Sequence, residues 1–220
     1  MAYKNLIFDF DGTLMDTSEV ILSTIKATIS DMHLPARTDA ECRAIIGIRT
    51  DEAGGYLYPD LEVSNLEFAR HFRSNYERLK SDAREKTFPG VLSTLAELRA
   101  AGHRLAIASS RRESSLRDYL QGLGVEDWFE MVVGADSVTK GKPDPEPVLR
   151  VLDSLGWNPR ETMVIGDADV DILMGSRAGC KTCAVTYGNG SLQSLEAVNP
   201  DYMIDQITTL SEILAEESET

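Results

Sequence analysis

The strongest constraint on the fold is a set of short runs that are apolar at every position. They occupy residues 6–8, 105–108, 131–133, 163–165 and 183–185. A strand with one face in water alternates apolar and polar residues, whereas a parallel strand buried on both faces is apolar throughout. Helical patterns lie between the runs, as where Leu116, Leu120 and Leu123 recur at helical spacing before Gly124. This alternation predicts an α/β fold, with a parallel sheet covered by helices on both faces.

One long stretch, residues 17–87, breaks this rhythm because it contains helical patterns and no convincing strand. Two apolar stripes occur there at helical spacing, Ile21, Ile25, Ile29 and Met32, followed by Phe68, Phe72, Tyr76 and Leu79. A third helical patch covers residues 40–46. We therefore predict a Rossmann-like core domain from residues 1–16 and 88–220, with a small all-helical cap domain, 17–87, inserted after the first strand.

Aspartates follow two of the predicted strands. Asp9 and Asp11 come directly after residues 6–8 and lead into Gly12, and Asp167 and Asp171 follow residues 163–165. In open α/β sheets, ligands bind in the crevice beyond the carboxyl ends of the strands. Adjacent carboxylates in such a crevice repel each other unless a cation or a shared proton compensates. Carboxylate oxygens are ligands that Mg²⁺ prefers, so the pattern favours a cation site over simple turn formation.

Two further signals are weak when taken singly. Ser109 and Ser110 follow the run 105–108, where serines commonly serve as caps. Lys142 lies in a proline-rich loop, where lysines are commonly solvated. Only in combination with the aspartates do these serines and this lysine indicate a functional site.

Together these segments resemble the four motifs of the haloacid dehalogenase superfamily of phosphohydrolases. The segments that carry the resemblance are Asp9-x-Asp11-Gly-Thr-Leu-x-Asp16, Ser109, Lys142-Pro143 and Gly166-Asp167-x-x-x-Asp171. The helical insertion directly after the first segment resembles the subgroup that contains phosphoglycolate phosphatases and β-phosphoglucomutases. This resemblance implies a Mg²⁺-dependent phosphatase that hydrolyses a small phosphorylated metabolite through an aspartyl-phosphate.

The resemblance also implies roles for the residues in the first motif and the fourth. Asp9 is expected to be the nucleophile, and Asp11 to protonate the leaving oxygen and then activate water. Mg²⁺ is expected to be held by the carboxylate of Asp9, the backbone carbonyl of Asp11, and Asp167. Asp171 would order the loop or metal-bound water, and the backbone of Gly12 would donate to phosphate.

The remaining predicted site residues bind phosphate or the rest of the substrate. By the same resemblance, Ser109 and Lys142 are expected to bind the transferring phosphoryl group, with help from the backbone of Ser110. We also predict that Arg49 in the cap contacts the distal part of the substrate and that Arg111 adds positive potential at the mouth of the site.

Several alternatives share the same catalytic core. A β-phosphoglucomutase-like enzyme would pass the phosphoryl group to a sugar, and a pyrophosphatase or nucleotidase would act on another phosphate. A non-catalytic ligand-binding regulator is the alternative from a different class, but such a protein has no need of both Asp9 and Asp11.

Composition narrows the partners and the compartment. The formal net charge is −14, which disfavours nucleic acids and anionic membrane surfaces. No apolar run is long enough to span a bilayer, and the N-terminal apolar stretch is interrupted by aspartates. The three cysteines are too few for a disulfide framework, so Cys180 and Cys183 are expected to pack in the core. We expect a cytoplasmic monomer or homodimer.

Overall fold

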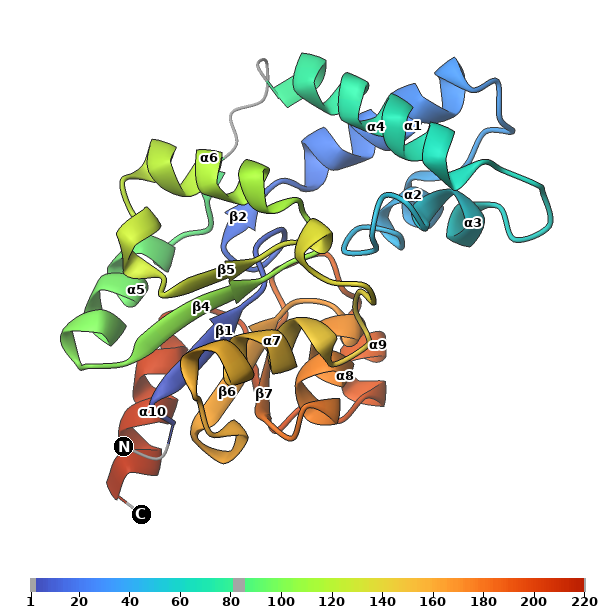
Figure 1. Cartoon of the computed structure of the whole chain (residues 1–220). Coiled ribbons are helices and arrows are strands. Elements are labelled where there is room, and N and C mark those ends of the chain that lie inside the picture. Colours follow the sequence, from blue (N-terminus) through green and yellow to red (C-terminus); the bar gives the residue numbers. More distant parts are fainter. Residues whose placement is uncertain (1–2, 81–85, 220) are drawn as a thin grey trace.

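A six-stranded parallel sheet forms the centre of the molecule. The computed structural model describes residues 3–80 and 86–219. Within them the strand order is β5-β4-β1-β6-β7-β8 (Figure 1). These strands are β1 (Asn5–Phe8), β4 (Arg104–Ala108), β5 (Met131–Val133), β6 (Thr162–Gly166), β7 (Lys181–Val185) and β8 (Tyr202–Ile204). The first five coincide with the apolar runs, so the predicted parallel sheet is confirmed.

Both faces of the sheet are covered by helices. Leu6 and Phe8 of β1 belong to an apolar cluster on one face, and Ile7 belongs to a cluster on the other, because successive side chains point to opposite faces. The first face carries α5 (Val91–Ala100), α6 (Glu113–Leu123) and α10 (Thr209–Glu219), and the second carries α7 (Glu146–Leu155) and α8 (Asp169–Arg177). Because the central positions of β1, β4, β6 and β7 are buried on both faces, an apolar run is the pattern that these strands require.

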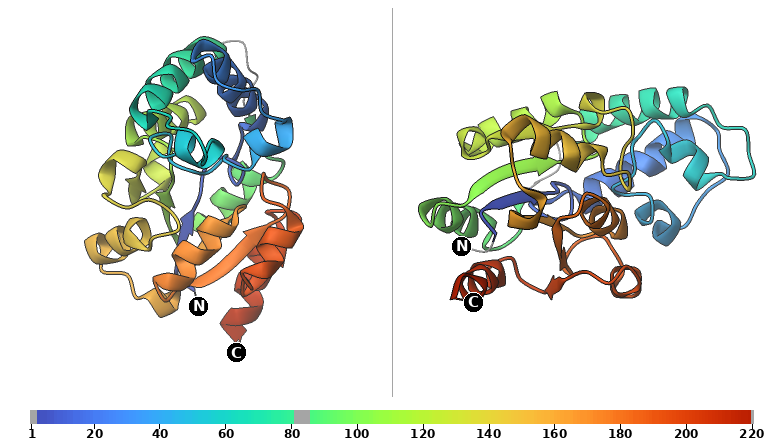
Figure 2. Two further views of the ribbon diagram at one scale, coloured as in Figure 1. Left: turned by 90° about the vertical axis from the view of Figure 1, so that its right-hand side faces the viewer. Right: turned by 60° about the horizontal axis from the view of Figure 1, so that its bottom comes forward.

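Among the described residues, four helices lie between the first strand and the rest of the sheet. They are α1 (Ser18–Asp31), α2 (Asp39–Arg43), α3 (Ala53–Leu57) and α4 (Asn65–Lys80). Both views in Figure 2 place them together at one end of the molecule, opposite the two termini. The predicted helical insertion after β1 is thus confirmed. Residues 81–85 of the expected cap domain lie outside the described residues, and the domain limits stay a prediction.

A two-stranded antiparallel ribbon joins the helical cap to the core. It pairs β2 (Met15–Asp16) with β3 (Lys86–Thr87), so the chain enters and leaves the cap at one place. The cap has an apolar cluster of its own, in which Ile25 of α1 and Phe68 of α4 are buried. The cap therefore has a hydrophobic core separate from the clusters that hold helices on the sheet.

Three smaller observations complete the fold. A helix α9 (Leu192–Ala197) follows β7. Cys42, Cys180 and Cys183 are free and buried, which confirms that the last two pack as apolar residues. In the described part of the chain, no helix is both long enough and apolar enough to cross a membrane.

Candidate active site

Three buried carboxylates converge at the carboxyl ends of two neighbouring strands. Asp9 follows β1, Asp167 follows β6, and Asp171 lies in the first turn of α8. One oxygen from each lies within 4.8 Å of the others. The strands place the first two because β1 and β6 are paired in parallel and end at the same edge of the sheet. The convergence expected from the sequence is therefore present.

Lys142 lies between two of these carboxylates. Its Nζ donates hydrogen bonds to Oδ1 of Asp9 at 2.5 Å and to Oδ1 of Asp171 at 2.6 Å. All three side chains are buried. Burial lowers the pKa of Lys142, but the two carboxylates outweigh it and the pKa is raised overall. The lysine is therefore a fixed positive charge beside Asp9.

One ammonium group does not balance three carboxylates. Burial raises the pKa of Asp9, an effect that Lys142 opposes and the charge of Asp171 reinforces. Burial, followed by the charge of Asp171, raises the pKa of Asp167 to about 7. A cluster of oxygen donors with uncompensated negative charge is the donor set that Mg²⁺ prefers. The residues present therefore fit a hard divalent cation.

Two loops orient the carboxylate of Asp167. Thr13 Oγ1 donates to its Oδ1 at 2.8 Å, and the backbone N–H of Asn189 donates to its Oδ2 at 2.7 Å. Gly12 has a φ of +93°, and a Cβ there would lie 2.2 Å from Oδ2 of Asp167. Thr13 and Asn189 were not predicted. The motif contained Thr13, but no sequence pattern singled out Asn189, which follows a different strand.

Asp171 has two partners, one on each oxygen. Its Oδ2 accepts a hydrogen bond from the backbone N–H of Ala168 at 3.0 Å, while Oδ1 faces Lys142. The first contact satisfies a backbone N–H at the N-terminus of α8. The second ties that helix to the loop before α7.

Asp11 lies apart from the carboxylate cluster. Its carboxylate accepts hydrogen bonds from Arg111 Nε at 2.9 Å, Arg111 Nη2 at 2.5 Å and Thr17 Oγ1 at 2.7 Å. Thr17 is the N-cap residue of α1, but its hydroxyl makes no cap hydrogen bond and donates to Asp11 instead. Asp9 and Asp11 nevertheless line the same cavity.

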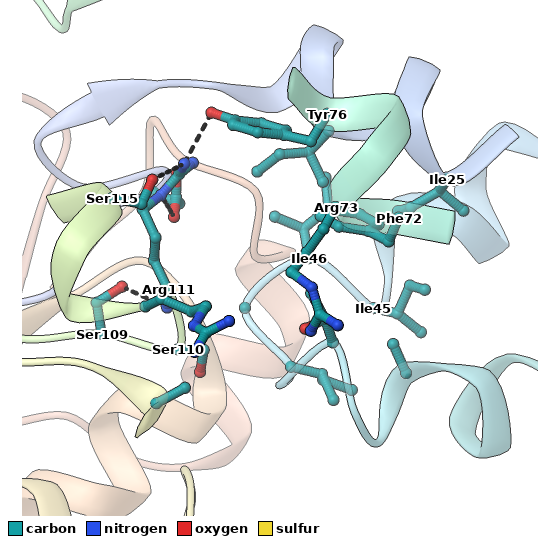
Figure 3. A pocket seen from close by; sticks show the side chains of 18 of the residues that line it. Ile25, Ile45, Ile46, Phe72, Arg73, Tyr76, Ser109, Ser110, Arg111 and Ser115 are labelled. Atoms are coloured by element: carbon teal, nitrogen blue, oxygen red, sulfur yellow. Dashed lines mark hydrogen bonds and ion pairs between the residues drawn. The ribbon is translucent and has the colours of Figure 1, made fainter. Parts of the chain in front are cut away.

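Arg111 also connects the core to the cap. Its Nη1 donates to the hydroxyl of Tyr76 on α4 at 2.8 Å and to Ser115 Oγ on α6 at 3.2 Å (Figure 3). Its guanidinium lies 4.8 Å from the ring centroid of Tyr76 and 5.0 Å from that of Tyr119. Arg111 is thus almost buried, lines the same cavity and connects the core to the cap, and its predicted contribution of positive potential there stays a prediction.

The serines after β4 face the same cavity. Ser109 is buried and its Oγ accepts a hydrogen bond from the backbone N–H of Arg111 at 3.2 Å, and Ser110 lies beside it (Figure 3). Both line the cavity together with Asp9 and Asp11. Ser109 and Ser110 therefore border the same space as Asp9 and Asp11, and their predicted binding of a phosphoryl group stays a prediction.

Arg49 occupies a different place, between the cap and a core loop. Its Nη1 donates to the carbonyl oxygens of Ala135 at 3.1 Å and Val138 at 3.3 Å, and Asp51 accepts from Nε and Nη2. The side chain also covers Gly141, where a Cβ would lie 2.4 Å from Cδ of Arg49. The cavity lining does not include Arg49. Its predicted contact with the substrate stays a prediction.

Comparison with known proteins extends over nearly the whole chain. The sequence profile described as "Haloacid dehalogenase-like hydrolase" matches residues 6–185. The probable phosphatase IndB of Dickeya dadantii is 32% identical over 212 residues, which cover 95% of this chain and 91% of that protein. The pyrophosphatase PpaX of Bacillus velezensis is 33% identical over 94% of each chain. A phosphoglycolate phosphatase of Psychrobacter arcticus is 32% identical over 97% of this chain and 96% of its own.

Solved structures share the fold. A predicted phosphoglycolate phosphatase from Haemophilus somnus superposes with a TM-score of 0.86 at 24% identity, covering 97% of this chain and 99% of the other. A haloacid dehalogenase-like hydrolase from Bacteroides fragilis gives a TM-score of 0.84 at 29% identity, with coverages of 94% and 99%. The α/β core with a helical insertion after β1 is thus common to all three chains.

Proposed function

The chain belongs to the haloacid dehalogenase-like hydrolases, and from that premise we propose that it is a Mg²⁺-dependent phosphatase acting on a small phosphorylated metabolite through an aspartyl-phosphate. The observation that carries the proposal is the position of Asp9. Its carboxylate is buried at the end of β1, is bonded to Lys142, lies beside Asp167 and Asp171, and lines a cavity. These contacts support Asp9 as the nucleophile, with Lys142 as the cation beside it and the carboxylate cluster as the metal site.

Asp9, Asp167 and the backbone carbonyl of Asp11 are the groups that would hold Mg²⁺. When bound, the ion neutralises charge on the phosphate and on the carboxylates that surround it. Asp171 takes a supporting part, since its two oxygens are occupied by Lys142 and by the backbone of Ala168.

The first chemical step uses Asp9 as the nucleophile. A carboxylate oxygen forms a bond to phosphorus as the bond from phosphorus to the alcohol oxygen breaks. Asp11 gives its proton to that oxygen, so the alcohol leaves neutral. In the second step Asp11 takes a proton from water, and the water oxygen displaces Asp9 from phosphorus. Phosphate and free Asp9 result.

The cations and donors of the core hold the phosphoryl group during both steps. Lys142 and the hydroxyl of Ser109 would bind its oxygens, with the backbone N–H groups of Gly12 and Ser110 as further donors. Asp11 is bonded to Arg111 and Thr17 in the described arrangement. These contacts fix the orientation of the Asp11 carboxylate beside the cavity.

A pyrophosphatase is the second candidate. It is favoured by the relative named pyrophosphatase PpaX, which is 33% identical to this chain. The chemistry at Asp9 is the same for both substrates, because pyrophosphate only replaces the alcohol with a second phosphate as the leaving group.

The test is release of inorganic phosphate from a panel of phosphate esters and pyrophosphate, with and without Mg²⁺. We expect release only with Mg²⁺, and we expect Asp9→Asn to lower kcat by a factor of about 10³ or more because it removes the nucleophile. Asp169→Asn is the matched control, since Asp169 lies between Asp167 and Asp171 but outside the carboxylate cluster. Mass spectrometry of the rapidly quenched enzyme should find one phosphoryl group on the peptide that contains Asp9. Full activity of Asp9→Asn would refute the mechanism.

A further inference from the structure

The cavity above Asp9 has two chemically different walls. It has a volume of about 320 Å³ and lies between the core and the cap. Its core wall is polar except for Ala135, and includes Asp9, Ser109 and Arg111. Its cap wall is built mainly from five isoleucines and three aromatic residues. Figure 3 shows the polar side chains on one side of this space, facing Ile25, Ile45, Ile46 and Phe72.

Only the polar wall is explained by phosphate chemistry. A phosphoryl group bound next to Asp9 and Ser109 would use the hydroxyl, ammonium and backbone donors described above. The isoleucine and phenylalanine side chains of this wall offer no partner to phosphoglycolate or pyrophosphate, whose other ends are also anionic; of the cap residues that line the cavity, only Arg73 is a cation. Ligand cavities combine apolar walls with a few polar groups that fix orientation, and the apolar part of the ligand covers the apolar walls.

Packing inside the cap does not account for this wall by itself. The cap cluster also contains Cys42, Leu57 and Tyr58, which are buried and do not line the cavity. Those three residues are part of the hydrophobic core of the cap and do not border the cavity. The isoleucines at 45 and 46 belong to the same cluster, yet they border a space large enough for a ligand.

The aromatic part of the wall has a defined geometry. Phe72 and Tyr76 lie one turn apart on α4, with their rings 6.2 Å apart and inclined by only 8°. The hydroxyl of Tyr76 is fixed by Arg111, so this ring is held in place from the core side. Two nearly parallel rings beside isoleucine side chains form a surface against which a planar group can pack.

We infer that the substrate is a phosphate monoester whose alcohol carries a planar, largely apolar ring, with the phosphate on Asp9 and the ring against Phe72 and the isoleucines of the cap. This inference rests on the proposed phosphatase function and narrows it. Arg73 also lines the cavity beside this wall and provides a donor for a polar substituent on the ring (Figure 3). Phosphoglycolate and pyrophosphate would leave the apolar wall uncovered.

The test compares two esters that differ only in the ring. Ethyl phosphate and 2-phenylethyl phosphate are both esters of primary alcohols, so their leaving groups are closely matched. We expect kcat/KM for the phenylethyl ester to be higher by about tenfold or more, since even small apolar groups change kcat/KM by about that factor in a hydrophobic pocket. Calorimetric binding of the two corresponding phosphonates, which are not hydrolysed, should show the same order.

Substitutions in α4 test whether the preference for the phenylethyl ester depends on Phe72. Phe72→Ala should lower the ratio of the two kcat/KM values by about threefold or more, because one face of the ring site is lost. Phe72→Leu keeps an apolar side chain for cap packing but removes the planar face, and should lower the ratio too. Leu66→Ala is the control, because Leu66 is on the same helix, is 76% exposed and lies outside the cavity. It should leave the ratio unchanged.

The outcomes separate the two proposals. Equal kcat/KM values and equal phosphonate binding for the two compounds would overturn the ring inference while leaving phosphatase activity intact. A ring preference that persists in both Phe72 variants would overturn the assignment to this wall. Failure to release phosphate from any ester with Mg²⁺ would instead overturn the proposed function, and the ring inference with it.

Discussion

The guanidinium of Arg111 donates two hydrogen bonds to the carboxylate of Asp11, across 100 residues of sequence. The side chains are only 9% and 12% exposed. Arg111 also binds the hydroxyl of Tyr76 on the cap helix α4, so one cation joins the proposed acid–base residue to the cap. The position of Asp11 is therefore coupled to the position of the cap.

Replacing Arg111 should impair both stability and activity. Arg111→Gln leaves Asp11 without its cation, and loss of one partner of a buried ion pair costs about 3–5 kcal/mol. Arg111→Lys keeps the charge but not the fork geometry, and a misplaced acid–base group should lower kcat/KM by about 100-fold. Urea denaturation and phosphate release measure the two effects.

The pair formed by Arg104 and Glu130 is the matched control for stability. It also has two hydrogen bonds, but its side chains are 43% and 38% exposed. Arg104→Gln should change the free energy of unfolding by no more than about 1 kcal/mol. If both variants lost the same stability, burial would not explain the importance of Arg111.

Addition of Mg²⁺ should raise the melting temperature, and a chelator should reverse the rise. A ligand at 100 times its Kd stabilises the folded state by about 2.7 kcal/mol, which for a chain of this size is about 5–10 °C. Asp167→Asn should abolish most of the shift, because Asp167 supplies a carboxylate to the cluster. Asp169→Asn should keep it. An equal shift in both variants would place the ion elsewhere.

His103 should make stability depend on pH. Burial lowers its pKa, an effect that the hydrogen bond to the carbonyl of Tyr3 only partly offsets. Below the ordinary histidine pKa of about 6.5, the unfolded chain therefore binds a proton that the folded chain resists. The free energy of unfolding is therefore higher above a pH of about 6.5. It decreases as the pH falls from there toward the lower pKa that His103 has in the folded chain.

The measurement for His103 is urea denaturation at pH 7.5 and pH 5.5. The parent protein should lose more stability than His103→Gln over this interval, because the variant lacks the titrating ring while sharing every other titrating group. A greater loss in the variant would mean that folding favours the protonated ring.

Uniform burial made the sheet predictable. Leu6, Ile7 and Phe8 of β1 are fully buried, which accounts for the apolar run, and the buried Asn5 before them donates a hydrogen bond to Thr162. β8 was missed because it is three residues long and only Ile204 among them is buried. α3 was missed because Gly54 and Gly55 are poor helix formers, and packing against α4 outweighs that propensity.

The approach of the carboxylates could be predicted from the topology of the sheet. The side chains that contact these carboxylates could not. Parallel strands end at one edge, so Asp9 and Asp167 had to approach each other once the sheet was known. The contact of Asp11 with Arg111 depends on side-chain rotamers, and the contact of Asn189 with Asp167 depends on a loop after another strand. Neither arrangement leaves a pattern along the sequence.

Arg49 offers the clearest test of how the cap contributes to activity. Its guanidinium is bonded to the carbonyls of Ala135 and Val138 and to Asp51, so it holds a cap segment against the core. If this is its role, Arg49→Ala should lower kcat/KM by a similar factor for ethyl phosphate, 2-phenylethyl phosphate and phosphoglycolate, since each needs the same positioned cap. Direct contact with the distal part of a substrate would instead raise KM most for phosphoglycolate, whose distal group is an anion. Steady-state kinetics on the three esters distinguish these outcomes, and a selective effect on phosphoglycolate would show that Arg49 leaves the core loop when substrate binds.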